Sequence, residues 1–157
     1  MNIDIMKCKL VKDSTLNYGN VASATDAADV LRKIGIHNAA EEYAYILCLN
    51  CKGNIVGIHE ISHGDITGTP VHPREVYKRA LINNAVGIIF AHNHPSGVAS
   101  PSPEDIVVTH KLYMAGELIG IRLKDSIIIT DTDAFSFSAN DLLKPEIPME
   151  TEDINFY

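Results

Sequence analysis

The chain has 157 residues, of which 46% are hydrophobic, so it can bury the core of one ordinary domain and is too short for two. Thirteen Lys and Arg against 20 Asp and Glu give a net charge of -7, and no stretch gathers basic residues, which argues against binding along a nucleic-acid backbone. The longest strongly apolar run near the middle, residues 85–91, cannot cross a bilayer, and the N-terminus lacks the layout of a secretory signal, so no membrane partner and a cytoplasmic location are expected.

The three cysteines, Cys8, Cys48 and Cys51, are predicted to be free thiols. An odd number of cysteines in a chain with a full-sized core does not indicate a disulfide framework. Cys48 and Cys51 form a C-x-x-C, but a structural zinc site would need a second pair of Cys or His. A redox C-x-x-C normally opens a helix, whereas this pair ends a strand-like run.

The first part of the chain predicts a weak strand and a helix. Residues 5–12 alternate imperfectly between apolar and charged side chains, as a half-buried strand does. Ser23 can cap a helix, because Asp26 stands three residues later and apolar residues follow at helical spacing. This helix is expected to end near Gly35.

A hairpin and a second helix are predicted next. Residues 43–49 and 55–61 have the composition of paired strands, with turn residues between them. A third short strand is expected after Gly64. Pro73 is well placed as the first residue of a helix that ends at residues 83–84.

The most buried strand is predicted at residues 86–91, a continuous apolar run that suits a central strand covered on both faces. A helix is expected from Ser102 to about Leu118, and residues 121–130 form another strand. From Asp131 the chain is polar and interrupted by prolines.

Helices interleaved with strands predict an α/β fold, namely an α-β-α sandwich around a mixed sheet. The expected organisation is an N-terminal strand and lead-in over residues 1–22 and a main domain over residues 23–130. A C-terminal strand and a loosely held acidic tail are expected over residues 131–157.

Four residues carry the strongest functional pattern: His92, His94, Ser102 and Asp105, in the spacing H-x-H-x7-S-x-x-D. Side chains two apart on a strand lie on one side, so His92 and His94 can bind the same metal ion at the end of the central strand. Asp105, on the first turn of the next helix, is expected to lie close to these two histidines. Two imidazoles and one carboxylate leave a fourth zinc position open for water, as in catalytic sites, although other divalent ions accept the same ligands.

Ser102 has two alternative roles. Its hydroxyl can hydrogen-bond the metal-bound water or an oxyanion that forms on the substrate. Ser102, Pro103 and the acids after them also make an ordinary helix start, with a Ser cap and negative charge near the positive end of the helix dipole. A general base for amide hydrolysis is not part of this pattern.

Two other interpretations of the histidines are set aside. His92-Asn93-His94 spells the letters of a nuclease class, but in those enzymes the three residues are dispersed over a ββα unit. The H-x-E and P-C-x-x-C pair of zinc deaminases is absent from the sequence.

The pattern and its surroundings resemble a known family. H-x-H-x7-S-x-x-D is the JAMM signature of JAB/MPN metalloprotease domains, and residues 91–97 followed by Pro101 and Ser102 are similar to the bacterial RadC-like branch. Further matches to that branch, in the same order, occur at residues 64–67, 71–76, 115–116 and 121–123. The resemblance spans residues 23–130.

The resemblance implies the MPN sandwich, which is cytidine-deaminase-like, and one zinc ion per chain. The ligands would be His92, His94 and Asp105, and Ser102 would assist the reaction.

The family also has a glutamate at the start of an early strand as general base. Counting back eight residues from Asn50 places this base at Glu42. Glu41 is one residue away and would put Tyr43 where the family often has an aromatic residue. Both acids therefore stay open, with Glu42 preferred, and two solvated acids before a strand are the alternative without function.

Two features depart from the RadC-like branch. Asp125-Ser126 stands where these chains usually have Asp-His before the last strand, so any role of that His is absent. The chain also starts close to the JAB domain, without the helix-hairpin-helix portion of full-length relatives, as expected for a short, mobile-element or phage-type version.

The sequence thus favours a zinc metallopeptidase that cleaves an amide bond of a peptide or protein substrate, with Glu42 as base and Ser102 stabilising the tetrahedral product. One alternative is a non-catalytic MPN-fold module that binds a protein or DNA. Another is a DNA-repair or mobile-element accessory protein, which the family association suggests and the net charge does not. The substrate and the oligomeric state stay open.

Overall fold

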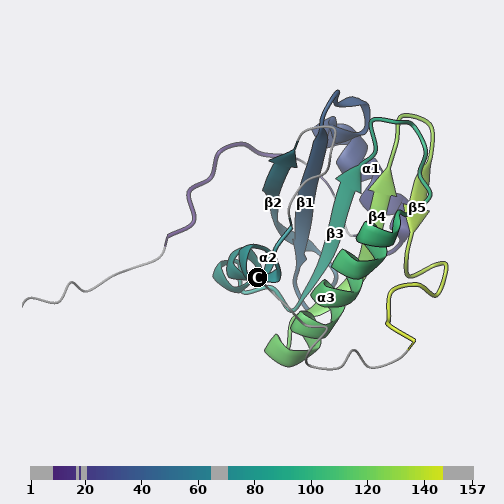
Figure 1. Cartoon of the computed structure of the whole chain (residues 1–157). Helices are drawn as coiled ribbons and strands as arrows, with labels where there is room; N and C mark the ends of the chain where they lie inside the picture. Colours follow the sequence, from purple (N-terminus) through teal and green to yellow (C-terminus); the bar gives the residue numbers. More distant parts are fainter. Residues whose placement is uncertain (1–8, 17, 19–20, 65–70, 147–157) are drawn as a thin grey trace, which may run out of the picture.

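A five-stranded mixed sheet forms the middle layer of the computed structural model, which describes residues 9–16, 18, 21–64 and 71–146. Helix α1 covers one face of the sheet, and helices α2 and α3 cover the other (Figure 1). This arrangement is the predicted α-β-α sandwich of the α/β class.

The described helices are α1 (Ala24–Ile34), the short 3-10 helix η1 (Ile36–Asn38), α2 (Pro73–Ile82) and α3 (Pro103–Ile119). The described strands are β1 (Glu42–Leu49), β2 (Ile55–Gly64), β3 (Gly87–Asn93), β4 (Arg122–Ile129) and β5 (Ala134–Ser136). They follow the order β2-β1-β3-β4-β5 across the sheet. Only β3 and β4 pair in parallel, with α3 as the connection between them, and the other neighbouring pairs are antiparallel.

Strand β3 lies in the centre of the sheet, and both of its faces are buried, as its apolar run predicts. Ile88 and Phe90 pack with α2 and α3, whereas Ile89 and Ala91 pack with α1. This alternation follows from the two-residue period of a strand. It places His92, two residues after Phe90, on the side of α2 and α3.

The predicted helix boundaries are confirmed within one or two residues. Ser23 caps α1, and the helix ends at Gly35, whose φ of 92° lies in the left-handed region that favours glycine. Helix α2 begins at Pro73, and α3 begins directly after Ser102. Capping residues thus predict helix ends well, because their hydrogen bonds are local.

The predicted strand over residues 5–12 is wrong where the structure describes it. Residues 9–12 belong to no strand: β2 and β5 are the edge strands of the sheet, and neither of them pairs with this segment. Residues 5–8 lie outside the described part. The short strand expected after Gly64 and the acidic tail beyond residue 146 also fall on residues that the structure does not describe.

Cys48 and Cys51 are both free, as predicted, and Cys8 lies outside the described residues. Cys48 is buried in β1, and burial raises the pKa of its thiol to about 12. Cys51 is exposed in the turn between β1 and β2. This C-x-x-C is therefore part of a hairpin and not of a redox helix.

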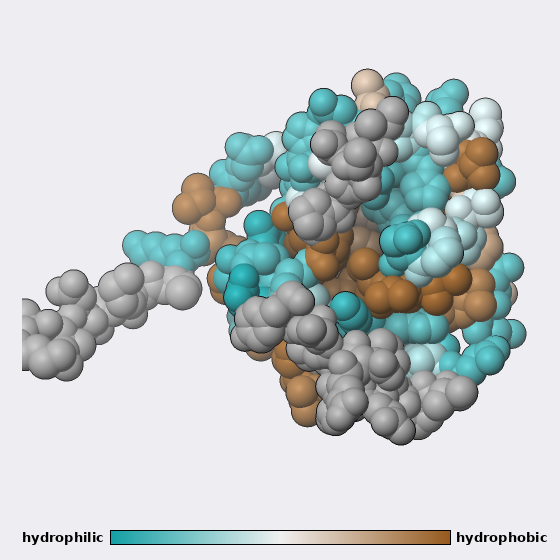
Figure 2. Space-filling model, in the orientation of Figure 1, coloured by the Kyte–Doolittle hydropathy of each residue, from teal (hydrophilic) through white to brown (hydrophobic). Residues whose placement is uncertain are grey.

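Helix α3 lies in front in Figure 1 and is apolar on more than one side. Leu112 and Ala115 are buried against the sheet, while Leu118 is 89% exposed. Figure 2 shows hydrophobic side chains among hydrophilic ones on this face of the molecule. None of the helices in the described ranges is long and apolar enough to cross a membrane.

Candidate metal centre

Three predicted ligands meet at the end of β3. The Nε2 atoms of His92 and His94 lie 3.1 Å apart. Asp105 places Oδ1 at 3.0 Å from Nε2 of His92 and Oδ2 at 3.4 Å from Nε2 of His94. Because one ligand atom from each residue lies within 4.8 Å of the others, the cluster could hold one metal ion.

The end of β3 explains how the two histidines come together. His92 is buried on the face that also carries Phe90, and its Nδ1 has no hydrogen-bond partner among the described residues. His94 follows the strand, donates its backbone N–H to the carbonyl of Ile129, and pairs Nδ1 with the carbonyl of Val98 at 2.8 Å. Because a carbonyl oxygen only accepts, this contact makes Nδ1 a hydrogen-bond donor, and Nε2 faces the cluster.

Asp105 is held by the start of α3. Its Oδ2 accepts hydrogen bonds from the backbone N–H of Ser102 at 2.7 Å and from the Ser102 hydroxyl at 2.6 Å. The hydroxyl oxygen in turn accepts the N–H of Asp105 at 3.1 Å, which completes a capping box. Ser102 therefore fixes the carboxylate, and a role of its hydroxyl toward an oxyanion stays a prediction.

The charges of the cluster favour an ionised carboxylate beside imidazole. Burial alone would raise the pKa of Asp105, but hydrogen bonds from His92, His94 and Ser102 hold it well below its ordinary range. The hydrogen bond to Asp105 raises the pKa of His94, and the charge of Glu42 contributes to the same shift. A cation at this point would thus be attracted by the negative charges of Asp105 and Glu42.

The two candidate bases lie in different surroundings. Glu42 is the first residue of β1 and shares its face of the strand with Ala44, the direct partner of His92 on β3. Glu41 is exposed, and its carboxylate pairs with Nε2 of His63 on β2. Glu42 therefore lies on the face of the sheet that carries the candidate metal ligands, while Glu41 pairs with His63 on the edge strand β2.

Asn93 is a site residue that the sequence motif did not reveal. Its side chain is fully buried, and it bonds to the backbone of Glu41 and of Tyr43 on β1. The only signal in the sequence was a polar residue at the end of an apolar strand. Its partners could not be found without the register of β1 against β3.

Ser126 occupies the place where the RadC-like branch usually has His. It is buried in β4, and its hydroxyl accepts a hydrogen bond of 2.9 Å from the hydroxyl of Thr109 on α3. The departure is therefore accommodated by a polar pair inside the core, so no buried group is left unsatisfied there.

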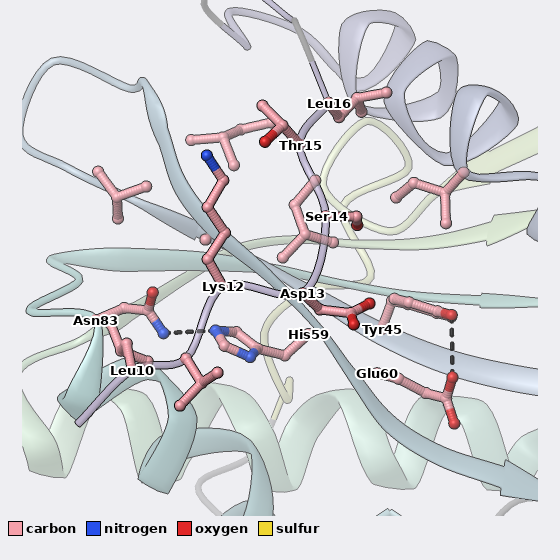
Figure 3. A pocket seen from close by; sticks show the side chains of 16 residues that line it. Leu10, Lys12, Asp13, Ser14, Thr15, Leu16, Tyr45, His59, Glu60 and Asn83 are labelled. Carbon is pink, nitrogen blue, oxygen red and sulfur yellow. Dashed lines mark hydrogen bonds between the residues drawn. The ribbon is translucent and has the colours of Figure 1, made fainter. Parts of the chain in front are cut away.

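A groove of about 740 Å³ lies apart from this cluster, between residues 10–16 and strand β2 (Figure 3). Its walls carry two polar pairs, in which Tyr45 donates to Glu60 and the Asn83 side chain bonds to His59. None of the three metal-cluster residues lines this groove. We therefore do not assign it to the candidate centre.

The fold and the residues at the end of β3 define the class of protein. The family model described as the RadC-like JAB domain matches residues 21–142. The chain therefore belongs to the RadC-like JAB domain family.

Relatives with the printed name UPF0758 protein support this assignment. The one from Nitrosococcus oceani is 40% identical over 133 residues, which cover 83% of this chain and 58% of the relative. The one from Coxiella burnetii is 38% identical over 135 residues, or 86% of this chain and 60% of the relative. The chain spans about half the length of the curated relatives it matches.

Proposed function

We propose that the protein is a zinc-dependent metallohydrolase of the JAMM type, a peptidase or isopeptidase that cleaves an amide bond of a peptide or protein. The observation that carries this proposal is the meeting of His92, His94 and Asp105 at one point, with Glu42 on the adjacent strand. Membership of the RadC-like JAB domain family supports it.

The donor set fits zinc. Imidazole nitrogen and carboxylate oxygen are both zinc ligands, and three protein ligands are the number found in catalytic sites that keep one position open. The mutual approach of two Nε2 atoms and a carboxylate within 4.8 Å suits a single ion. A bound zinc ion would supply Lewis acidity that makes water a nucleophile at neutral pH.

The remaining chemistry belongs to side chains. Glu42 would take a proton at a carboxylate oxygen and later give it to the leaving nitrogen, because an amine leaves only when it is protonated. The Ser102 hydroxyl donates its one proton to the ligand Asp105. During the reaction this proton would turn from Asp105 toward the oxyanion of the tetrahedral product. Glu42 is preferred to Glu41 because it shares its face of β1 with Ala44, the partner of His92.

The proposal is tested with zinc-loaded protein and a panel of peptides and isopeptide-linked conjugates. We expect hydrolysis by the parent, and we expect Glu42→Gln to abolish it while zinc content stays at about one per chain. Glu41→Gln is the matched control, since it removes the neighbouring acid, and it should retain activity. If Glu42→Gln and the parent cleave equally well, the assignment of the base is wrong, and a parent that binds no zinc would overturn the proposal.

A further inference from the structure

The side chain of Asn93 bridges β3 to the start of β1 through two hydrogen bonds. Its Oδ1 accepts the backbone N–H of Tyr43 at 2.7 Å. Its Nδ2 donates to the backbone carbonyl of Glu41 at 2.9 Å. These two backbone groups belong to the peptide units on either side of Glu42.

The bridge continues the sheet beyond the last backbone pair. The register of β1 against β3 ends at Ala44 and His92, and the amide of Asn93 supplies both an acceptor and a donor for the next step. An asparagine side chain is suited to this, because its amide group has the same donor and acceptor as a peptide. The side chain is fully buried, so the two bonds are shielded from water.

Asn93 also stands between His92 and His94 in the chain. One residue thus joins the two histidine ligands covalently and holds the backbone of Glu42 through hydrogen bonds. We infer that Asn93 is a positioning residue that sets the place of Glu42 relative to the metal ligands. This inference rests on the proposed function, because it assumes that Glu42 acts beside a metal ion held by the histidines.

Asn50 provides a matched control, because it has a merely structural role in a turn. The Oδ1 of Asn50 accepts the backbone N–H groups of Lys52 and Asn54, at 2.9 and 3.1 Å, in the turn at the other end of β1. Each asparagine therefore makes two side-chain bonds to the backbone near one end of the same strand. Only Asn93 is connected to the metal cluster.

The test uses Co²⁺ alone as the probe and the carboxyl carbon of Glu42 as the reporter. Protein with ¹³C-labelled glutamate gives a carboxyl signal that the Glu42→Gln spectrum assigns. Paramagnetic broadening of this signal by bound Co²⁺ falls steeply with distance. We expect Asn93→Ala to reduce the broadening by roughly half or more, since a supporting contact controls placement on the scale of an ångström or less. Asn50→Ala should leave it unchanged.

Co²⁺ affinity separates positioning of the base from positioning of the ligands. Asn93→Ala should weaken Co²⁺ binding by less than about tenfold, the lower limit for loss of a partner that orients a ligand. Unchanged broadening in Asn93→Ala overturns the inference and leaves the proposed function intact. Loss of Co²⁺ binding in Asn93→Ala also overturns it, because Asn93 would then act through the histidines.

The parent spectrum tests the proposed function separately. A Glu42 carboxyl signal that stays sharp when Co²⁺ is bound would show that Glu42 lies far from the metal. That outcome contradicts Glu42 as the base, and the inference falls with it.

A second measurement on the parent covers the case in which Asn93→Ala does not fold. The N–H of Tyr43 should exchange with deuterium slowly, like the amides of the β1–β3 ladder, because Asn93 accepts it. Exchange of this amide at the rate of an open loop would overturn the inference without any variant.

Discussion

Helices α1 and α3 begin with the same capping box, yet only one of them contributes to a candidate metal centre. In α1, the carboxylate of Asp26 accepts the Ser23 N–H and hydroxyl, both at 2.9 Å, and the Ser23 oxygen accepts the Asp26 N–H at 3.2 Å. In α3, Ser102 and Asp105 repeat these three bonds at 2.7, 2.6 and 3.1 Å. The local structure is therefore the same at both helices.

The two boxes differ in what the sheet places opposite them. The Oδ2 of Asp26 also accepts the backbone N–H of Ala22, and the side chain lies near the surface. Asp105 faces His92 and His94, because α3 connects two parallel strands and starts beside the carboxyl end of β3. Through topology, a capping motif thus also supplies a candidate metal ligand, and the capping bonds themselves do not distinguish the two cases.

Removing the two carboxylates should give the largest difference between the helices. We expect Asp105→Ala to weaken zinc binding by more than the roughly 10- to 100-fold typical of outer partners of a ligand, because a ligand itself is lost. Asp26→Ala removes the equivalent acid of α1 and should bind zinc like the parent. Titration against a competing chelator measures both affinities, and equal affinities in the two variants would contradict the comparison.

Removing the two serines should give a smaller effect that the helices partly share. Ser102→Ala and Ser23→Ala should each lower the free energy of unfolding by about 1 kcal/mol, measured by urea titration of metal-free protein. Ser102→Ala should also weaken zinc binding by about tenfold, since the hydroxyl orients Asp105. Identical zinc affinities in the two variants would mean that Ser102 is a helix cap alone.

The smallest expected effect concerns the pH dependence of the α1 box. The backbone N–H of Ala22 and the Ser23 hydroxyl lower the pKa of Asp26 below its ordinary value of 3.8. The stabilisation by ionised Asp26 is therefore present above pH 3.8 and is lost as the pH falls through the lower folded pKa.

The check is the difference in Tm between the parent and Asp26→Asn, which should shrink between about pH 5 and about pH 2. The double variant Ser23→Ala, Asp26→Asn should show a weaker pH dependence relative to Ser23→Ala, because one of the bonds to Asp26 is already gone. A difference in Tm that is constant with pH would argue against an ionised cap.

The features that the sequence predicted well are the ones with local causes. The ends of α1 and α3 follow from Ser23, Gly35 and Ser102, whose hydrogen bonds involve residues within one helical turn. The central position of β3 follows from its continuous apolar run. The spacing of His92 and His94 also sufficed to place both rings on one side of the chain.

Features that depend on pairing between distant segments were missed or left open. Alternation over residues 5–12 predicts a strand, but a strand forms only when its backbone pairs with another strand, and residues 9–12 pair with none of the described strands. The preference for Glu42 over Glu41 stays a proposal, and its support required the register of β1 against β3. The bonds of Asn93 join residues 50 and 52 positions apart, which no periodicity in a single sequence reports.

The candidate centre would also link zinc binding to folding. Its ligands His92, His94 and Asp105 meet only where the end of β3 lies beside the start of α3, and Glu42 reaches the same place only after a long loop between β1 and β3 has closed. An unfolded chain would not hold these residues together, and zinc would therefore bind the folded form. By mass action, a free zinc concentration of about 100 Kd would add about 2.7 kcal/mol to the free energy of unfolding, so the thermal stability of this domain would report the zinc supply of its surroundings.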